Sequence, residues 1–436
     1  MREPKVSIIV TIHNSAVTLE NCMKSVMNQR LRDIEILCID GGSTDDSPEI
    51  LRRLSADDNR IRIISDPVTG YGHKINRGIK EAAGKYIAIL ESDDQLKEDG
   101  IETLYQAAEE NDCDYVDGDY DGIFFVDGQR YVMPICKYGN ADIYGKLLDR
   151  HENLKYLGCA SGAIWTGLYK ISFLRKNGIE LSETPGASYQ DVSFAFLVTL
   201  LASSAYHLKK SVYFYWLDNG DSSTNDPKKV MAIIVEYDNL YEKLSQRKAD
   251  SYIWDRYYHT KYSSYYWNIC RLGLDNSLSF AEYYHDEVLR DEKEGHICRK
   301  TKDDIDYNIT FLIIDDLGTF NKNVNYQYSV GLNELKLISR MISSLVGKDV
   351  VIFGCGIRGH GLLKLMKKYG ISADCFCDNM QPNQKPDDIE IPIYKPEDAA
   401  AKYPKCVFAI PKGRYSTEMK EQLMEINVEK CRILEI

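Results

Sequence analysis

The chain has no long hydrophobic run and no excess of basic residues. Its longest mostly apolar stretch, about residues 194–205, is too short to span a bilayer. Lys and Arg number 54 against 66 Asp and Glu, which gives a formal net charge of −12. Nucleic acids and anionic lipid surfaces attract basic proteins, so this balance disfavours both as main partners. We expect a protein that binds no nucleic acid and touches a membrane only peripherally.

The twelve cysteines lack the patterns that bind zinc or build a disulfide framework. There is no CxxC pair, and no histidines follow the cysteines at zinc spacing. Residues 1–4 lead directly into the first expected strand, without the apolar segment of a signal peptide. We therefore expect reduced thiols in a cytoplasmic protein, either soluble or peripheral at the inner face of the membrane.

A chain of 436 residues with 44% hydrophobic residues is long enough for two or three domains with real cores. The pattern of apolar and polar residues changes twice along the chain. Residues 1–225 alternate short apolar runs with helical patterns, residues 226–347 are helix-rich and aromatic, and residues 348–436 return to short apolar runs. We predict an α/β domain, a helical accessory region and a small second α/β domain for these three parts.

In the first part, apolar runs of strand length alternate with helical patterns. The runs at residues 6–10, 34–39, 60–64 and 86–90 have the β-branched composition of buried parallel strands. Strand, helix, strand, helix in this order predicts a doubly wound α/β sheet. Ligands of such sheets bind at the carboxyl ends of the strands.

Two acidic residues, Glu91 and Asp93, directly follow the apolar run at 86–90. A hard divalent cation binds carboxylate oxygens and completes its shell with water and substrate phosphates. The end of the strand would direct both carboxylates to the ligand-binding edge. This spacing indicates a site for a metal-bound diphosphate, although an E-x-D triplet is also typical of a solvated turn.

Four motifs follow one another along this part of the chain. They are VSIIVTIHN at 6–14, IDGGSTDDSPEIL at 39–51, GYGHKINRGIKEAAGKYIAILESDD at 70–94 and TPGASYQDVSFAF at 184–196. Their order and spacing resemble the family 2 inverting glycosyltransferases, which have the GT-A nucleotide-diphospho-sugar transferase fold. A sugar nucleotidylyltransferase has a similar sheet, but its glycine-rich GxGTRxxP opening is absent here.

The resemblance implies a donor nucleotide site after the first two strands. Thr11, His13 and Asn14 would lie at the nucleotide, with His13 where the family often has Tyr, since either ring can stack on a base. Asp40 would accept a hydrogen bond from an imino N–H of the base, which suits uracil. A turn residue at the end of a strand is the alternative for Asp40.

The resemblance also implies contacts to the diphosphate. Lys74 and Asn76 would lie near it, although Lys74 also fits a solvated helix face. Glu91 and Asp93 occupy the family's D-x-D position, with Asp93 as ligand of Mn²⁺ or Mg²⁺ and Glu91 facing ribose or sugar. Glu replaces the first Asp here, and its extra methylene moves the carboxylate by about 1.5 Å. The metal would act as a Lewis acid on the leaving nucleotide diphosphate.

Acceptor-side roles follow from the fourth motif and its surroundings. Asp191 precedes an apolar helix expected over 194–202 and would take a proton from the acceptor hydroxyl, although a helix-capping Asp is the alternative. Gln190 stands where the family typically has Glu. Trp165 would stack on an acceptor sugar or pack in the core. Trp216 stands where Arg would be expected, which removes a bidentate partner for phosphate.

The middle region places aromatic residues at helical spacing. Tyr258, Tyr262, Tyr265 and Tyr266 would share one helix face. Such a face suits carbohydrate, a partner subunit or the membrane interface. Helix packing between two domains is the interpretation that we favour.

The last part begins with a strand expected over 348–353, and Gly354, Gly356 and Gly359 open the helix after it. Asp378 lies 22 residues after Gly356, close to the spacing at which an acid meets a ribose hydroxyl. The pattern resembles a Rossmann-like nucleotide-binding module. No residue set for redox catalysis accompanies it, so a bound nucleotide and a purely structural or dimerising module are both open.

The sequence thus predicts a metal-dependent inverting hexosyltransferase that uses a nucleotide-diphosphate sugar, with UDP as the expected nucleotide. Its acceptor would be a glycan or a lipid-linked precursor, and cell-surface polysaccharide synthesis is implied by the resemblance. Two alternatives belong to other classes. One is a catalytically inactive sugar- or nucleotide-binding scaffold, suggested by Glu91 and Trp216. The other is an NAD-dependent oxidoreductase acting through the C-terminal module.

Overall fold

The computed structural model describes residues 3–138, 142–158, 162–220, 226–299, 305–379, 391–413 and 415–436. The chain divides into two compact units. One consists of residues 1–123 and 133–328, and the other of residues 124–132 and 329–436. The division of the chain into three domains stays a prediction.

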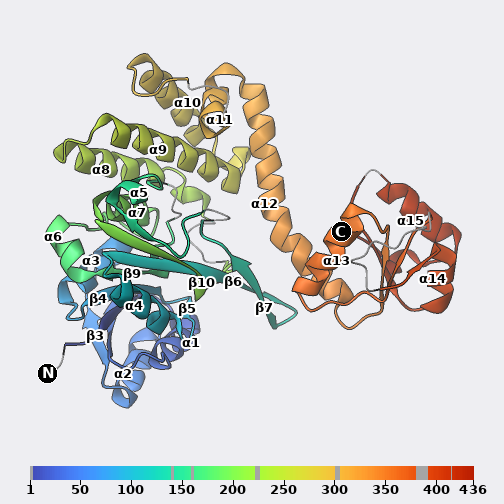
Figure 1. The fold of residues 1–436 in the computed structure, drawn as a ribbon, viewed down its shortest axis with the longest axis horizontal. Coiled ribbons are helices and arrows are strands. Elements are labelled where there is room, and N and C mark those ends of the chain that lie inside the picture. The colour runs from blue at the N-terminus through green and yellow to red at the C-terminus, as the bar shows by residue number, and fades with distance from the viewer. Residues whose placement is uncertain are drawn as a thin grey trace. The chain divides into compact units, whose positions relative to one another are not determined.

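Within the described residues, ten strands form one sheet that begins in the first unit (Figure 1). Its order is β3-β2-β1-β4-β9-β6-β10-β5, with β7 beside β6 and β8 beside β10. The first four strands pair in parallel, as the sequence predicts, whereas β9 runs antiparallel to both β4 and β6. The strands are β1 (Val6–Ile12), β2 (Ile34–Asp40), β3 (Ile61–Ser65), β4 (Tyr86–Glu91), β5 (Gln95–Leu96), β6 (Tyr115–Val126), β7 (Gln129–Ile135), β8 (Leu147–Asp149), β9 (Gly167–Lys170) and β10 (Ser204–Trp216).

Helices cover both faces of this sheet because its central strands are apolar on both sides. In β1, Ile8 and Val10 face one hydrophobic core and Ile9 faces the other. The core of Ile8 includes α1 (Ala16–Met27), α2 (Ser47–Asp57) and α4 (Gly100–Asn111). The core of Ile9 includes α3 (Tyr71–Glu81), α6 (Ile171–Asn177) and α7 (Gln190–Leu201), with α5 (Arg150–Leu154) packed against it.

More helices extend the core of Ile9 away from the sheet, and Figure 1 shows α8 and α9 stacked over α7. They are α8 (Ala232–Gln246), α9 (Ser251–Leu272), α10 (Leu278–Lys293), α11 (Ile305–Asp315) and the start of α12 (Leu317–Leu345). Three short helices lie in the connecting segments: η1 (Ile164–Thr166), η3 (Pro227–Lys229) and η4 (Leu274–Asn276). The aromatic face expected on α9 lies inside this core. Tyr258, Tyr262 and Tyr265 are buried in it, and Tyr266 is partly buried against it.

Among its described residues, the second unit contains a parallel sheet of five strands in the order β13-β12-β11-β14-β15. Its strands are β11 (Val350–Phe353), β12 (Cys375–Cys377), β13 (Ile393–Tyr394), β14 (Val407–Ile410) and β15 (Ile433–Glu435). Its helices are α13 (Ile357–Lys368), α14 (Pro396–Lys402), α15 (Ser416–Glu425) and the short η5 (Lys430–Arg432). A separate small α/β sheet is therefore present, as the sequence predicts.

The start of α3 lies directly against the segment that leads into α7. The backbone N–H of Tyr71 donates to the carbonyl of Gly186 at 2.8 Å. A Cβ atom on Gly72 would lie only 2.0 Å from the carbonyl oxygen of Ser182, so a side chain does not fit there. This close crossing of two backbones brings the N-terminus of α7 to the carboxyl edge of the sheet.

We expect Gly72→Ala to destabilise the first unit by about 1–3 kcal/mol, because its new methyl group would overlap backbone that cannot withdraw. Urea unfolding followed by circular dichroism measures this loss. Gly318→Ala is the matched control. Its Cβ would make only ordinary contact, and alanine gains up to about 1 kcal/mol over glycine within a helix. Equal unfolding midpoints for Gly72→Ala and the wild type would contradict the close crossing.

Candidate active site

The carboxyl ends of β1, β2 and β4 lie side by side and bring together residues that are far apart in the sequence. In the register of the sheet, Ile12 on β1 pairs with Asp40 on β2, and Thr11 pairs with Glu91 on β4. Because neighbouring parallel strands end at the same edge of a sheet, polar residues at their carboxyl ends meet there. The predicted donor residues Thr11, Asp40 and Glu91 therefore share one edge.

The loops after β1 and β2 are tied to each other. Asn14 accepts a hydrogen bond from the backbone N–H of Thr44 at 2.8 Å, and its own N–H donates to Ser43 Oγ at 2.9 Å. Asn14 has a positive φ of 50°, which Asn tolerates better than most residues. His13 is exposed, and its Nδ1 lies 3.2 Å from the carbonyl oxygen of Gly41. The side chain of Asn14 thus shapes the loops, and the ring of His13 stays accessible.

Asp40 is buried at the end of β2 and stabilises the following turn. Its Oδ1 accepts hydrogen bonds from Ser43 N at 3.0 Å and Ser43 Oγ at 2.7 Å. The turn role considered for Asp40 from the sequence is therefore present. Oδ2 has no hydrogen-bond partner among the described residues, so one oxygen remains for a ligand.

Lys74 is a buried cation on α3, with only 6% of its surface exposed, and not part of a solvated helix face. Burial lowers the pKa of its ammonium group to about 8, against the opposing charges of Asp40 and Glu91. Among the described residues, no carboxylate forms an ion pair with it. A buried cation without an ion-pair partner is suited to an anionic ligand.

Three acidic residues cluster at the end of β4 and in the loop after it, and oxygens of Glu91, Asp93 and Asp94 lie within 4.8 Å of one another. Burial and the charge of Asp93 raise the pKa of Glu91 to about 8. Burial also raises the pKa of Asp93, although a hydrogen bond from Asn219 Nδ2 at 2.8 Å acts in the opposite direction. Carboxylates crowded in this way repel one another unless a cation or protons compensate them.

Asp94 is the member of this cluster that the sequence analysis missed. Its oxygens accept hydrogen bonds from Tyr213 Oη at 3.0 Å and from the backbone N–H of Trp216 at 2.9 Å. Burial, together with the charges of Asp93 and Glu91, raises its pKa well above the usual range. Asp94 therefore fastens the end of β10 to the acidic loop. The adjacent pair Asp93-Asp94 was the available sequence signal.

Tyr71 connects the acidic cluster to the predicted base. Its hydroxyl donates to Glu91 Oε1 at 2.8 Å. Burial raises the pKa of this phenol well above its usual value, and the charges of Glu91 and Asp191 raise it further. Tyr71 thus lies within the electrostatic influence of both acids. It belongs to the third sequence motif, but no spacing rule assigned it a role.

Asp191 lies in the first turn of α7, which begins at Gln190 and not at the expected residue 194. The N-cap position is Tyr189, with a positive φ of 63°, so Asp191 is not the capping residue. Burial raises the pKa of Asp191 to about 7, although the backbone N–H groups of Asp191 and Val192 act in the opposite direction. The charge of Glu236 on α8 raises it further. A carboxylate with this pKa is suited to general-base chemistry near neutral pH.

Gln190 and Asn76 lie near the site, but their amides are engaged by the protein. Gln190 Nε2 donates to Thr184 Oγ1 at 2.9 Å, and its Oε1 accepts from Ser188 N at 2.6 Å. Asn76 Nδ2 donates to the carbonyl of Leu181 at 3.0 Å, and its Oδ1 accepts from Leu181 N at 3.0 Å. Both amides hold the segment before α7.

Trp165 is half-buried among aromatic residues of β6 and β10. Its ring is stacked on Tyr215 at 5.3 Å between centroids and lies 4.4 Å from Tyr213 and 4.8 Å from Tyr120. The indole N–H of Trp216 donates to Asp218 at 2.6 Å. Position 216 thus carries an indole bonded to a neighbouring carboxylate, where the family would have a guanidinium.

The predicted glycines of the second unit form a tight strand-to-helix turn. Gly354 has a φ of 98°, and a Cβ on Gly359 would lie 1.9 Å from the carbonyl oxygen of Gly354. Gly356 is the N-cap of α13. Asp378 Oδ2 accepts a hydrogen bond from Cys355 N at 2.9 Å, so this carboxylate supports the turn itself. A nucleotide at this turn stays a prediction.

Comparison with known proteins identifies the N-terminal part of the chain. Residues 7–166 match the family model described as Glycosyl transferase family 2. Glycosyltransferase GlyA of Streptococcus pneumoniae serotype 4 is 28% identical over 242 residues, which are 54% of this chain and 34% of GlyA. Glycosyltransferase GlyG of the same organism is 40% identical over 137 residues, 29% of this chain and 46% of GlyG.

The chain thus spans about a third to a half of the length of these curated relatives. A crystal structure of S. aureus TarS 1–349 in complex with UDP-GlcNAc aligns with a TM-score of 0.51 at 16% identity, covering 76% of this chain and 92% of that chain. This similarity and the match to the family model confirm the predicted GT-A fold. No helix among the described residues is both long and apolar enough to cross a membrane.

The hydrogen bonds of Asn76 predict a structural role. We expect Asn76→Ala to lower the free energy of unfolding by about 1–3 kcal/mol, because the backbone of Leu181 loses both of its partners on that side chain. Urea unfolding measures the loss, and calorimetry with UDP should give an unchanged affinity. Asn111→Ala, which removes a hydrogen bond at the end of α4, is the control. A stable variant with weakened UDP binding would instead indicate contact with the donor.

Proposed function

We propose that this protein is a metal-dependent inverting glycosyltransferase. It moves a sugar from a nucleotide diphosphate, with UDP as the nucleotide, to a hydroxyl group of a glycan or lipid-linked acceptor. The single observation that carries this proposal is the convergence at one edge of the sheet. There Glu91 interacts with its neighbour Asp93, with Asp191 and with Lys74, a cation that has no ion-pair partner among the described residues, and it accepts a hydrogen bond from Tyr71.

The acidic cluster suits a hard divalent cation, Mn²⁺ or Mg²⁺. Its donor atoms are all carboxylate oxygens, which such ions prefer, and two of the three acids are only half-buried. Both oxygens of Asp94 already accept hydrogen bonds, whereas Asp93 has one oxygen bonded to Asn219. Asp93 is therefore the principal ligand in this proposal, with Glu91 toward the ribose or sugar. When bound, the metal would stabilise negative charge on the departing diphosphate.

The remaining donor contacts come from the loops after β1 and β2 and from α3. The ammonium group of Lys74 would bind the diphosphate, since it faces the acidic cluster without an ion pair among the described residues. Asp40 Oδ2 is available to accept from a base N–H, and the exposed ring of His13 can stack on the base. A UDP-sugar supplies both features. The UDP-GlcNAc bound to the similarly folded TarS supports UDP as the nucleotide.

Asp191 is the general base of the proposed reaction. Its carboxylate takes the proton of the acceptor hydroxyl as that oxygen attacks the anomeric carbon from the side opposite the diphosphate. The bond between the anomeric carbon and the diphosphate oxygen breaks, and nucleotide diphosphate leaves with the bonding electrons. One displacement inverts the configuration of the sugar. Trp165 lies in the chain just after Gly162, beside which Asp191 rests, and would form part of the acceptor side.

A role in cell-surface polysaccharide synthesis is the biological part of the proposal. It follows from the resemblance of the sequence motifs to the family and from the glycosyltransferase relatives. The peripheral location at a membrane belongs to the same proposal, because a lipid-linked acceptor would be presented there.

Metal-dependent binding tests the donor half of the site. We expect Asp93→Asn to weaken UDP binding in the presence of Mn²⁺ by at least about tenfold, because the variant loses an anionic ligand of the ion. Calorimetry with and without Mn²⁺ measures it. Asp112→Asn, at an exposed turn, is the control. Equal Mn²⁺-dependent affinities for Asp93→Asn and the wild type would rule out Asp93 as the metal ligand.

The pH dependence of transfer tests the base. Asp191 has a pKa of about 7, so the fraction of reactive carboxylate should fall about tenfold per pH unit below that value. The rate of the wild type should therefore decline on the acid side of pH 7 and level off above it. We expect Asp191→Asn to keep its affinity for UDP and to lose transfer by about 10²–10⁴-fold. Transfer by this variant at the wild-type rate would assign the base to another group.

A further inference from the structure

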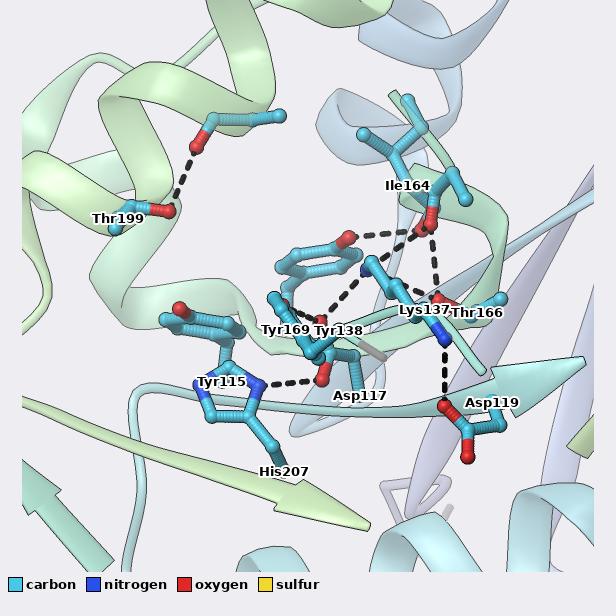
Figure 2. Close-up of polar contacts among 12 residues, drawn as sticks. Tyr115, Asp117, Asp119, Lys137, Tyr138, Ile164, Thr166, Tyr169, Thr199 and His207 are labelled. Atoms are coloured by element: carbon cyan, nitrogen blue, oxygen red, sulfur yellow. Dashed lines mark hydrogen bonds and ion pairs between the residues drawn. The ribbon is translucent and has the colours of Figure 1, made fainter. Parts of the chain in front are cut away.

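A network of buried charges lies between β6, β10 and the loop at η1 (Figure 2). Asp117 on β6 is 2% exposed and accepts hydrogen bonds from three side chains. These are Lys137 Nζ at 2.7 Å, His207 Nδ1 at 2.6 Å and Tyr138 Oη at 2.7 Å. Burial raises the pKa of Asp117, but the charges of Lys137 and His207 lower it by more, so the carboxyl group stays ionised.

Lys137 links this network to the backbone of the loop formed by residues 162–166. Its ammonium group donates to Thr166 Oγ1 at 3.1 Å and to the carbonyl oxygen of Ala163 at 3.3 Å. The hydroxyl of Thr166 donates to the same carbonyl at 2.9 Å. Figure 2 shows Lys137 beside Thr166. The backbone N–H of Lys137 donates to Asp119 at 2.8 Å, which fixes its own position.

The loop at 162–166 forms the wall against which the proposed base rests. A Cβ atom on Gly162 would lie 2.1 Å from Asp191 Oδ2, so the loop backbone and the carboxylate are in close contact. Tyr169 adds a second link, because its hydroxyl donates to the carbonyl of Ile164 at 2.8 Å and its ring contacts Phe194 on α7. A shift of this loop would therefore move the side chain of Asp191.

The network adds little to the free energy of unfolding. Desolvation of a buried ion pair offsets much of its Coulomb attraction, and apolar replacements are often neutral or stabilising. His207 Nε2 is also buried, and no described residue forms a hydrogen bond with it, which adds a desolvation cost. The gain from such an arrangement is a fixed geometry, since the ammonium group of Lys137 binds Asp117 on β6 and two oxygens of the loop at the same time.

We propose that Lys137 is a positioning residue for glycosyl transfer, which holds the 162–166 loop in the place where Asp191 can reach the acceptor hydroxyl. This inference rests on the proposed function. Lys137 touches no reacting atom and acts through the carbonyl of Ala163 and the hydroxyl of Thr166. Its loss should impair the acceptor half of the reaction and leave the donor half intact, because no described donor residue contacts it.

The test compares Lys137→Met with the wild type for transfer from a UDP-sugar at saturating acceptor. Methionine keeps an unbranched apolar side chain but lacks the three N–H donors of lysine. Asp117 keeps its hydrogen bonds from His207 and Tyr138. The rate is expressed per UDP-binding site, counted by calorimetry with Mn²⁺, so that misfolded protein does not enter it. We expect this rate to fall about 10- to 100-fold at unchanged KM for the donor, because small misplacements of catalytic groups have effects of this size.

Two further variants separate positioning from folding. Thr166→Val keeps the ion pair and removes only the hydroxyl link, so we expect a smaller fall in the same rate without loss of folded protein. Lys170→Met breaks an ion pair with the exposed Asp112 on the same sheet and should leave the rate unchanged. A wild-type rate per site in both Lys137→Met and Thr166→Val would overturn the inference. Failure of the proposed function would appear in the wild type, as absence of Mn²⁺-dependent UDP binding, and would overturn both.

Discussion

The contact between the start of α3 and the segment before α7 is the constraint on which the active site depends. Tyr71 takes part in it twice, through its backbone N–H to Gly186 and through its hydroxyl to Glu91. The proposed donor residues come from the parallel strands at the beginning of the chain, and the proposed base comes from a helix about a hundred residues later. Without this crossing, the proposed donor residues and the proposed base would not be held in a fixed position relative to each other.

The electrostatics of the site follow from its burial. Three carboxylates lie near one lysine at the edge of the sheet. Because the site is buried, water screens the repulsion between the carboxylates only weakly. Burial raises the pKa values of Glu91, Asp93 and Asp191, and neighbouring carboxylates raise those of Glu91 and Asp191 further. A cation and a substrate with donor groups would relieve this repulsion, and perturbed acids of this kind gather at functional sites for the same reason.

Local patterns predict the parts of this structure that depend on local physics. The apolar runs correctly predicted β1, β2, β3 and β4. In β1, β2 and β4 they are mostly apolar because both faces are buried, whereas the edge strand β3 exposes part of its run. The carboxyl ends of those strands then identified Asp40 and Glu91 by topology alone. The helix of Asp191 was predicted four residues late, since the polar pair before its apolar run gives no helical signal.

The remaining features depend on contacts between distant segments, which a single sequence does not reveal. The sequence did not predict that the amides of Asn76 and Gln190 bind backbone of the segment before α7, because only the tertiary fold brings these groups together. Lys137 follows an edge strand with no motif around it. The contact between Gly162 and Asp191 restricts substitution at position 191. Because the backbone of Gly162 already abuts Asp191 Oδ2, the longer chain of glutamate has no room there unless the loop withdraws, so a residue without a side chain selects the length of the acid that faces it.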